Sequence, residues 1–158
     1  MTDRIKILRE CIDNALPSMP DAFECRCAYV HLFGVAQACA LIAMKRGQDA
    51  ELATMAGMLH DFYAFKHMDP ENHGPKGAVF VREVLNELGL TTPEETDMIC
   101  TAIHNHSDKG GCFDAFTEIL IDADVMQHCL YDITMPVAER EKDRFENLSR
   151  EFGYEFQP

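Results

Sequence analysis

The sequence predicts an all-α fold, and three observations carry this prediction. Apolar residues recur at spacings of three and four in most segments, which is the pattern of one face of an amphipathic helix. Helix start and stop signals separate these segments, and the clearest is Thr92 to Glu95, a capping-box pattern with proline at the first helical position. The two-residue alternation of a half-buried β-strand is found in no segment. With 158 residues, the chain is expected to form a single domain, a compact helical bundle spanning residues 1–158.

The first half of the chain predicts three helices. Apolar residues over about 2–16 predict the first helix, which two prolines end. Asp21 is the expected N-cap of a long second helix that ends near Gly47. Asp49 is the expected N-cap of a third helix, whose apolar stripe leads directly to His60.

A long irregular stretch, residues 63–77, is expected to follow these helices. Further helices are expected to start near Pro75, Thr92 and Asp114. The last stretch, residues 135–152, is charged with sparse apolar positions, which predicts a surface helix that packs through one narrow stripe.

Composition and charge argue against several classes of partner. The net charge of −13 disfavours binding to a nucleic-acid backbone, which requires a cationic surface. It does not exclude a small phosphorylated substrate, because a bound metal can make one pocket locally positive. No apolar run approaches membrane-spanning length and the N-terminus lacks the apolar core of a signal peptide, so we expect no membrane and a cytoplasmic location. The seven cysteines form no CxxC pair and are expected to be reduced, mostly buried thiols.

The adjacent pair His60 and Asp61 lies at the end of an apolar helical run, where a neutral imidazole and a carboxylate are costly to bury without a partner. A divalent cation removes that cost, because it takes both groups as ligands. His31 and Asp124 are expected on the inward faces of two other helices. Each residue has an ordinary alternative, such as a core histidine bonded to a carbonyl or an aspartate paired with a basic residue. One shared metal explains all four together.

The order H…HD…D, here His31, His60-Asp61 and Asp124, resembles the HD superfamily of metal-dependent phosphohydrolases, and AGMLHD is similar to the run before its HD pair. The resemblance covers about residues 29–131. It implies an HD-domain helical bundle in which these four residues hold one cation and Asp61 also bridges to a second.

Some HD proteins carry further histidines that hold a second metal, and two stretches here resemble them. They are NHGPKGA, with His73, and AIHNHS, where His106 fits better than His104 because its helical face points inward. The alternative is that His73 caps its helix and His106 bonds a backbone carbonyl. His67 and His128 are interpreted as ordinary surface or packing residues.

The expected cofactor is a divalent transition metal, because imidazole and carboxylate ligands suit manganese, iron, cobalt, nickel or zinc. One site is expected and a second is possible. The expected catalytic residues are Asp61, as ligand and proton acceptor, and Lys66, which stands a few residues later than the lysine that follows the HD pair in many family members. Lys66, Lys76 and Lys109 are placed in loops around the site as candidates for binding an anionic substrate, with simple solvation as the alternative.

The leading hypothesis for function is hydrolysis of a nucleotide or another small phosphorylated metabolite through a metal-activated water. Two alternatives remain open: a di-iron oxygenase of the same fold, and a ligand-binding or regulatory module whose metal is structural. The substrate, the metal and the oligomeric state stay open at this point.

Overall fold

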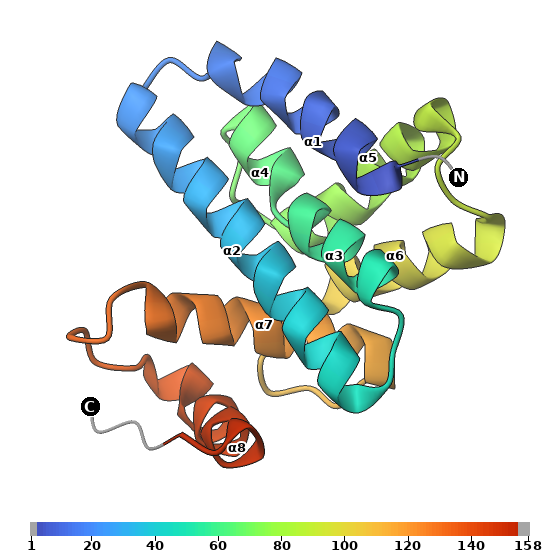
Figure 1. The fold of residues 1–158 in the computed structure, drawn as a ribbon. Helices are drawn as coiled ribbons and strands as arrows, with labels where there is room; N and C mark the ends of the chain where they lie inside the picture. The colour runs from blue at the N-terminus through green and yellow to red at the C-terminus, as the bar shows by residue number, and fades with distance from the viewer. Residues whose placement is uncertain (1–2, 155–158) are drawn as a thin grey trace.

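Helices make up all the regular secondary structure of the computed structural model, which describes residues 3–154 (Figure 1). This confirms the predicted all-α fold. Two short 3-10 turns, η1 and η2, accompany the α-helices. In chain order the elements are α1 Arg4–Ala15, η1 Leu16–Ser18, α2 Ala22–Arg46, α3 Ala50–Leu59, α4 Phe62–His67, α5 His73–Leu88, α6 Pro93–Asn105, α7 Ala115–Tyr131, η2 Glu139–Glu141 and α8 Lys142–Phe152.

The helix starts follow the capping signals of the sequence. The side chains of Asp21, Asp49 and Asp114 accept hydrogen bonds from backbone N–H groups in the first turns of α2, α3 and α7. Thr92 and Glu95 form a complete capping box at the start of α6. These bonds satisfy amides that have no partner inside the helix, so the local sequence decides where each helix begins.

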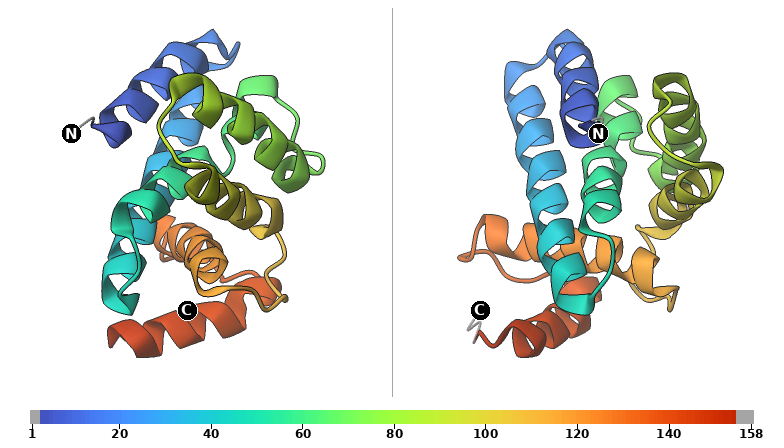
Figure 2. Two further views of the ribbon diagram at one scale, coloured as in Figure 1. Left: turned by 90° about the vertical axis from the view of Figure 1, so that its right-hand side faces the viewer. Right: turned by 45° about the vertical axis from the view of Figure 1, so that its right-hand side comes forward.

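Four helices meet at the centre of the molecule. Figure 2 shows α2 and α3 running side by side, with α7 crossing behind α2 in the right-hand view, while α6 packs against α3 and α7. One apolar cluster extends from Leu8 in α1 to Leu148 in α8. The predicted metal ligands His31, His60, His106 and Asp124 lie where α2, α3, α6 and α7 converge.

Two glycines let the helices approach closely around this centre. A Cβ atom on Gly57 of α3 would lie 2.6 Å from the Cα atom of Ala36 in α2. A Cβ atom on Gly74 of α5 would lie 2.8 Å from the carbonyl oxygen of His104 in α6. Since real Cβ atoms do not come so close to backbone atoms, both crossings require a residue without a side chain.

Helix α2 contradicts the expectation that no apolar run approaches membrane-spanning length. Among residues 3–154 it is the one helix long and apolar enough to cross a membrane, judged by length and composition alone. Its inner face is buried, as at Leu32 and Ile42, and its outer face also carries exposed apolar residues such as Leu41 and Met44. One such helix is weak evidence for a span, because the core helix of a folded domain meets the same criterion.

Two boundaries differ from the sequence-based expectation. Residues 63–77 are largely helical, since α4 and the start of α5 lie within them, and the loop is limited to residues 68–72. The last helix begins at Lys142 and not near residue 135. Asp132 instead accepts bonds from the backbone and hydroxyl of Thr134, a local turn that competes with helix. The predicted narrow stripe is confirmed, because Phe145 and Leu148 are the buried apolar residues of α8.

Candidate metal centre

The pair His60 and Asp61 stands at a break between two helices. His60 is the C-cap of α3, and Asp61, with φ −111° and ψ 8°, is the N-cap of α4. Successive side chains on an unbroken helix point about 100° apart, since there are about 3.6 residues per turn. The change of direction at Asp61 lets both side chains face the same point, and their ligand atoms, Nε2 and Oδ2, lie 3.5 Å apart.

A first group of ligand atoms comes from α2, the α3–α4 break and α7. His31 Nε2 lies 3.0 Å from His60 Nε2 and 3.3 Å from Asp61 Oδ2. Asp124 Oδ1 lies 3.6 Å from His31 Nε2 and 3.8 Å from His60 Nε2. The four residues predicted to bind one cation are therefore brought together from helices α2 and α7 and from the break between α3 and α4.

A second group shares Asp61 with the first. Its other oxygen, Oδ1, lies 3.3 Å from His73 Nε2 and 3.2 Å from His106 Nε2. The two histidine Nε2 atoms are 3.1 Å apart. The two carboxylate oxygens of Asp61 thus face different histidine pairs, which is the arrangement of a bridging ligand. His104 is exposed on α6, as the sequence predicted.

The orientation of the rings shows which nitrogen each histidine presents to the centre. In His60, His73 and His106 the Nδ1 atom lies 2.6–2.9 Å from a backbone carbonyl oxygen, which can only accept a hydrogen bond. Nδ1 of His31 makes the same contact, at 2.8 Å, with the side-chain oxygen of Gln127. When these imidazoles are neutral, Nδ1 carries the proton and Nε2 presents a lone pair to the centre. Histidine ligands of metals are commonly held in this way.

Two carboxylate oxygens in the centre have no hydrogen-bond partner. They are Oδ1 of Asp61 and Oδ1 of Asp124, and both are buried. A buried carboxylate oxygen without a partner is costly, and lone pairs of neighbouring imidazoles make it costlier. The Ser107 hydroxyl can donate a hydrogen bond to His73 Nε2 at 2.9 Å, but its single hydrogen cannot satisfy both carboxylate oxygens and the imidazole lone pairs as well.

These residues fit a divalent cation. Ligand atoms about 2.0–2.1 Å from one metal are about 2.8–3.4 Å apart at right or tetrahedral angles. The distances within the two groups are 3.0–3.8 Å. Groups of histidine and aspartate that could hold a metal ion are His31–His60–Asp61 and Asp61–His73–His106, among others. The donor set contains nitrogen and oxygen only, which suits the first-row transition metals.

The electrostatics keep His60 and Asp61 in their metal-binding protonation states. Burial lowers the pKa of His60 to about 4, so its imidazole is neutral near pH 7. Burial alone would raise the pKa of Asp61, but the adjacent His60 and the other histidines outweigh it and hold that pKa well below its usual range. The pKa of His31 behaves differently: burial lowers it, yet the carboxylates of Asp61 and Asp124 outweigh burial and raise it.

Lys109 has a place that the sequence did not predict. It was expected in a loop around the site and does lie in the loop between α6 and α7, but its ammonium group is buried and bonds both the Asp124 carboxylate and the carbonyl oxygen of His106. A buried ammonium requires such a partner. The Lys109 charge outweighs the effect of burial and lowers the pKa of Asp124. Lys109 thereby occupies Oδ2 of Asp124 and leaves Oδ1 facing the histidines.

The other two lysines lie on helices and not in loops. Lys66 lies in the last turn of α4 with its ammonium 4.7 Å from the centre of the Phe80 ring. The ring of the neighbouring Phe65 makes a T-shaped contact with His31. Lys76 lies in the first turn of α5 and pairs with Asp69 at 2.7 Å. The structure does not bring either ammonium group to the ligand atoms, and their substrate contacts stay predictions.

His128 is the residue of this centre that the sequence analysis missed. Its interpretation as a surface or packing residue agrees with a side chain that is 38% exposed, yet its Nε2 lies 3.3 Å from Asp124 Oδ1. The available signal was its spacing, since residues four apart on a helix share a face. The partners Gln127 and Glu141, which bond His31 and His128, gave no signal of their own.

Comparison with known proteins decides the family. A family model of the HD domain matches residues 28–128, which include every histidine and aspartate of the centre. The chain belongs to the HD-domain family. The fold of this HD protein is similar to that of a predicted HD superfamily hydrolase from an uncultured Thermotogales bacterium, with a TM-score of 0.56 and 21% identity over 96% of this chain and 88% of that chain. No curated protein matches the sequence.

Proposed function

We propose that this HD protein is a metal-dependent phosphohydrolase that acts on a nucleotide or another small phosphorylated metabolite. The observation that carries the proposal is the position of Asp61 between two histidine pairs, with one carboxylate oxygen toward each. A carboxylate placed in this way supports a two-cation centre. Bound divalent cations would supply Lewis acidity toward a phosphoryl oxygen and would lower the pKa of water.

The protein's own contribution is to hold six ligand residues, of which the four histidines have their Nδ1 protons facing outward. The lowered pKa of Asp61 favours its role as ligand over its predicted role as proton acceptor. Neutral His60 adds no positive charge that would repel a cation. The chain thus offers two carboxylates and four imidazoles, in agreement with the ligand set that the family resemblance implies.

One side of the centre offers room for a substrate. The ligands His60, His106 and Asp124 are buried, while His31, Asp61 and His73 are partly exposed. A cavity of about 330 Å³ reaches toward this side. None of the ligands lines it, but its lining includes Phe65, whose ring centroid is 6.0 Å from that of His31, and Pro70, whose carbonyl oxygen accepts a hydrogen bond from His73. This volume suits part of a small metabolite, and Lys76 and Lys66 are the proposed contacts of its phosphate.

The test is phosphate release from a panel of nucleotides and phosphoesters, with protein loaded separately with manganese, cobalt, nickel or iron. We expect release that depends on added metal and is lost in Asp61→Asn. His104→Asn, which changes an exposed histidine outside the centre, is the matched control and should keep full activity. Oxygen consumption by the iron-loaded protein without phosphate release would instead support the oxygenase. Tight metal binding with no turnover would support a regulatory module.

A further inference from the structure

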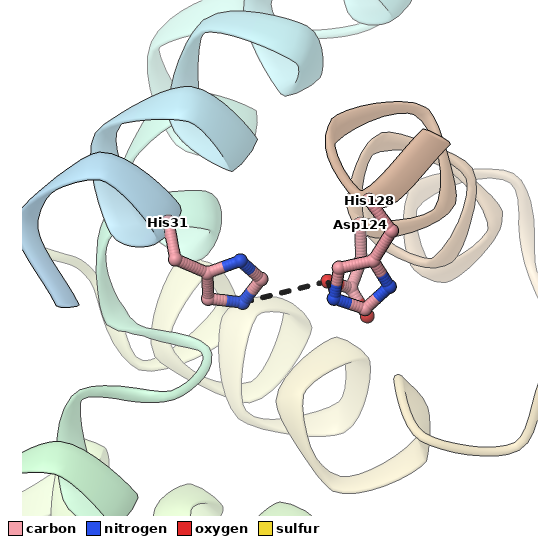
Figure 3. A group of neighbouring side chains, drawn as sticks. All are labelled: His31, Asp124 and His128. Carbon is pink, nitrogen blue, oxygen red and sulfur yellow. Dashed lines mark ion pairs between the residues drawn. The ribbon is translucent and has the colours of Figure 1, made fainter. Parts of the chain in front are cut away.

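His128 faces the metal centre from the exposed end of α7. It lies one turn after Asp124, and Figure 3 shows both side chains directed toward His31 of α2. The His128 and His31 rings are stacked, with centroids 5.2 Å apart and an interplanar angle of 11°. The three residues form another group whose ligand atoms could hold a metal ion.

The His128 ring is held in the same way as the four predicted histidine ligands. Its Nδ1 lies 3.1 Å from Oε1 of Glu141, a carboxylate that is 3% exposed. Glu141 belongs to the turn η2, which precedes α8. With Nδ1 held by an acceptor on the outer side, Nε2 is the atom directed at the centre. The pattern of an outer acceptor and an inner Nε2 therefore occurs five times around this centre.

An ion pair alone does not explain the position of His128. A protonated His128 between two carboxylates would donate one hydrogen bond to Glu141 and the other to Asp124. Asp124 Oδ1 has no hydrogen-bond partner, although His128 Nε2 is only 3.3 Å away. The two atoms are thus close without the alignment of a hydrogen bond. The separation lies in the range of about 2.8–3.4 Å expected for two atoms that bind one cation at right or tetrahedral angles.

We propose that His128 is a further protein ligand of the cation that His31, His60, Asp61 and Asp124 hold, with Glu141 as the residue that positions it. The proposal rests on the metal centre of the proposed function and not on the reaction catalysed. Five protein ligands would leave about one position free in a six-coordinate site. Open positions for water and substrate would then lie mainly on the side of His73.

The proposal also gives the C-terminal segment a role. The family match ends at residue 128, whereas Glu141 lies beyond it. Residues that orient a metal ligand through its second ring nitrogen commonly change metal affinity by about 10–100-fold when they are replaced. Glu141 is thus expected to affect the metal from outside the matched region.

The experiment compares metal binding by the full chain and the variants His128→Ala, Glu141→Gln and His104→Ala. Cobalt(II) serves as the probe, because its visible absorption reports coordination number and its affinity can be measured by competition with a chelator. We expect His128→Ala to keep the number of bound cobalt ions but to bind the tighter one at least about 10-fold more weakly, with a changed spectrum. Glu141→Gln should change affinity in the same direction by less, and His104→Ala should match the wild type.

Three outcomes would overturn the proposal. Unchanged affinity and spectrum in His128→Ala would leave an ion pair only. Loss of one whole equivalent with an unchanged spectrum for the remaining cobalt would indicate a separate cation at His31, Asp124 and His128. Absence of cobalt binding by the wild type would remove the metal centre itself and the proposed function with it. If cobalt binds as expected but no phosphoester is hydrolysed, the proposed function fails alone.

Discussion

The metal centre has two halves that share Asp61: His31, His60 and Asp124 form the first half, and His73 and His106 form the second. The two halves differ in how exposed their side chains are. The side chains of His60 and Asp124 are 0% and 6% exposed, and they come from helices that form the central crossing. The His73 side chain is 27% exposed and follows a loop in which Asn72 has a left-handed backbone conformation. Because the first half is part of the core, changes there should affect stability and metal together. Changes at His73 should affect metal alone, whereas His106, the other histidine of the second half, is buried like His60.

The largest loss of metal binding is expected at Asp61, the ligand that both halves share. Asp61→Ala removes the carboxylate that faces both histidine pairs, so it should abolish binding of both cations together with activity. Asp61→Asn, which keeps one carbonyl oxygen, should bind metal weakly. Metal analysis after dialysis tests this, with two equivalents per chain expected for the wild type. Full metal content in Asp61→Ala would show that the two halves do not share this ligand.

The next largest effect is expected at Gly57, where α3 crosses α2 closely beside the buried half of the centre. Gly57→Ala places a methyl group against the Ala36 backbone and must push α2 and α3 apart. Overpacking of this kind costs about 1–3 kcal/mol, and separating His31 from His60 should weaken the first cation as well. Urea unfolding and metal titration measure the two effects. Gly110→Ala is the matched control, since its Cβ atom would meet only the Asp108 carboxylate at 3.8 Å. Equal stability of the two variants would contradict the close crossing.

The buried half should also make stability depend on pH when metal is removed. Burial lowers the pKa of His60 from its ordinary 6.5 to about 4. Between these values the unfolded chain binds a proton at this histidine that the folded protein does not bind, so stability falls as pH decreases from about 6.5 to about 4. The loss is at most about 3 kcal/mol. The raised pKa of His31 has the opposite effect. Its protonated form stabilises the fold below about pH 6.5, and this contribution is lost as the pH rises above that value.

Urea unfolding of chelator-treated protein at several pH values measures this dependence. The wild type should lose stability toward pH 4.5, while His60→Asn should show a smaller slope. His104→Asn, with its exposed histidine outside the centre, should follow the wild type. Identical slopes for the wild type and His60→Asn would mean that His60 is not held neutral by burial.

The smallest effect on stability is expected in the open half. His73→Ala should lower metal content from two equivalents to one, because it removes a ligand of the second cation only. Its effect on the stability of the metal-free protein should be within about 0.5 kcal/mol, as for other partly exposed positions. Metal analysis and thermal unfolding with chelator check both statements. A loss of both cations in His73→Ala would show that the halves are not separable.

Local signals in the sequence were sufficient for most of the fold. Asp21, Asp49 and Thr92 determine helix starts through bonds to amides only two or three residues away, and such signals can be read from the chain. They failed where the signal was weak, as in the irregular stretch expected at residues 63–77 and the late start of α8. The helical spacing also predicted correctly that His60, His106 and Asp124 are buried.

The tertiary structure decided which atoms of those residues meet. Which nitrogen of His31 faces the centre depends on the side chain of Gln127, which the tertiary arrangement brings to the ring. The rings of His60, His73 and His106 instead use carbonyl oxygens only three residues earlier in the chain. The pairing of Lys109 with Asp124 and the approach of Glu141 to His128 likewise join separate elements. The sequence determined the helices and the chemical types of the ligands, because these depend on neighbours along the chain. Only the packing of the helices decided their directions and charge partners, because a buried charge is satisfied by whatever the fold brings beside it.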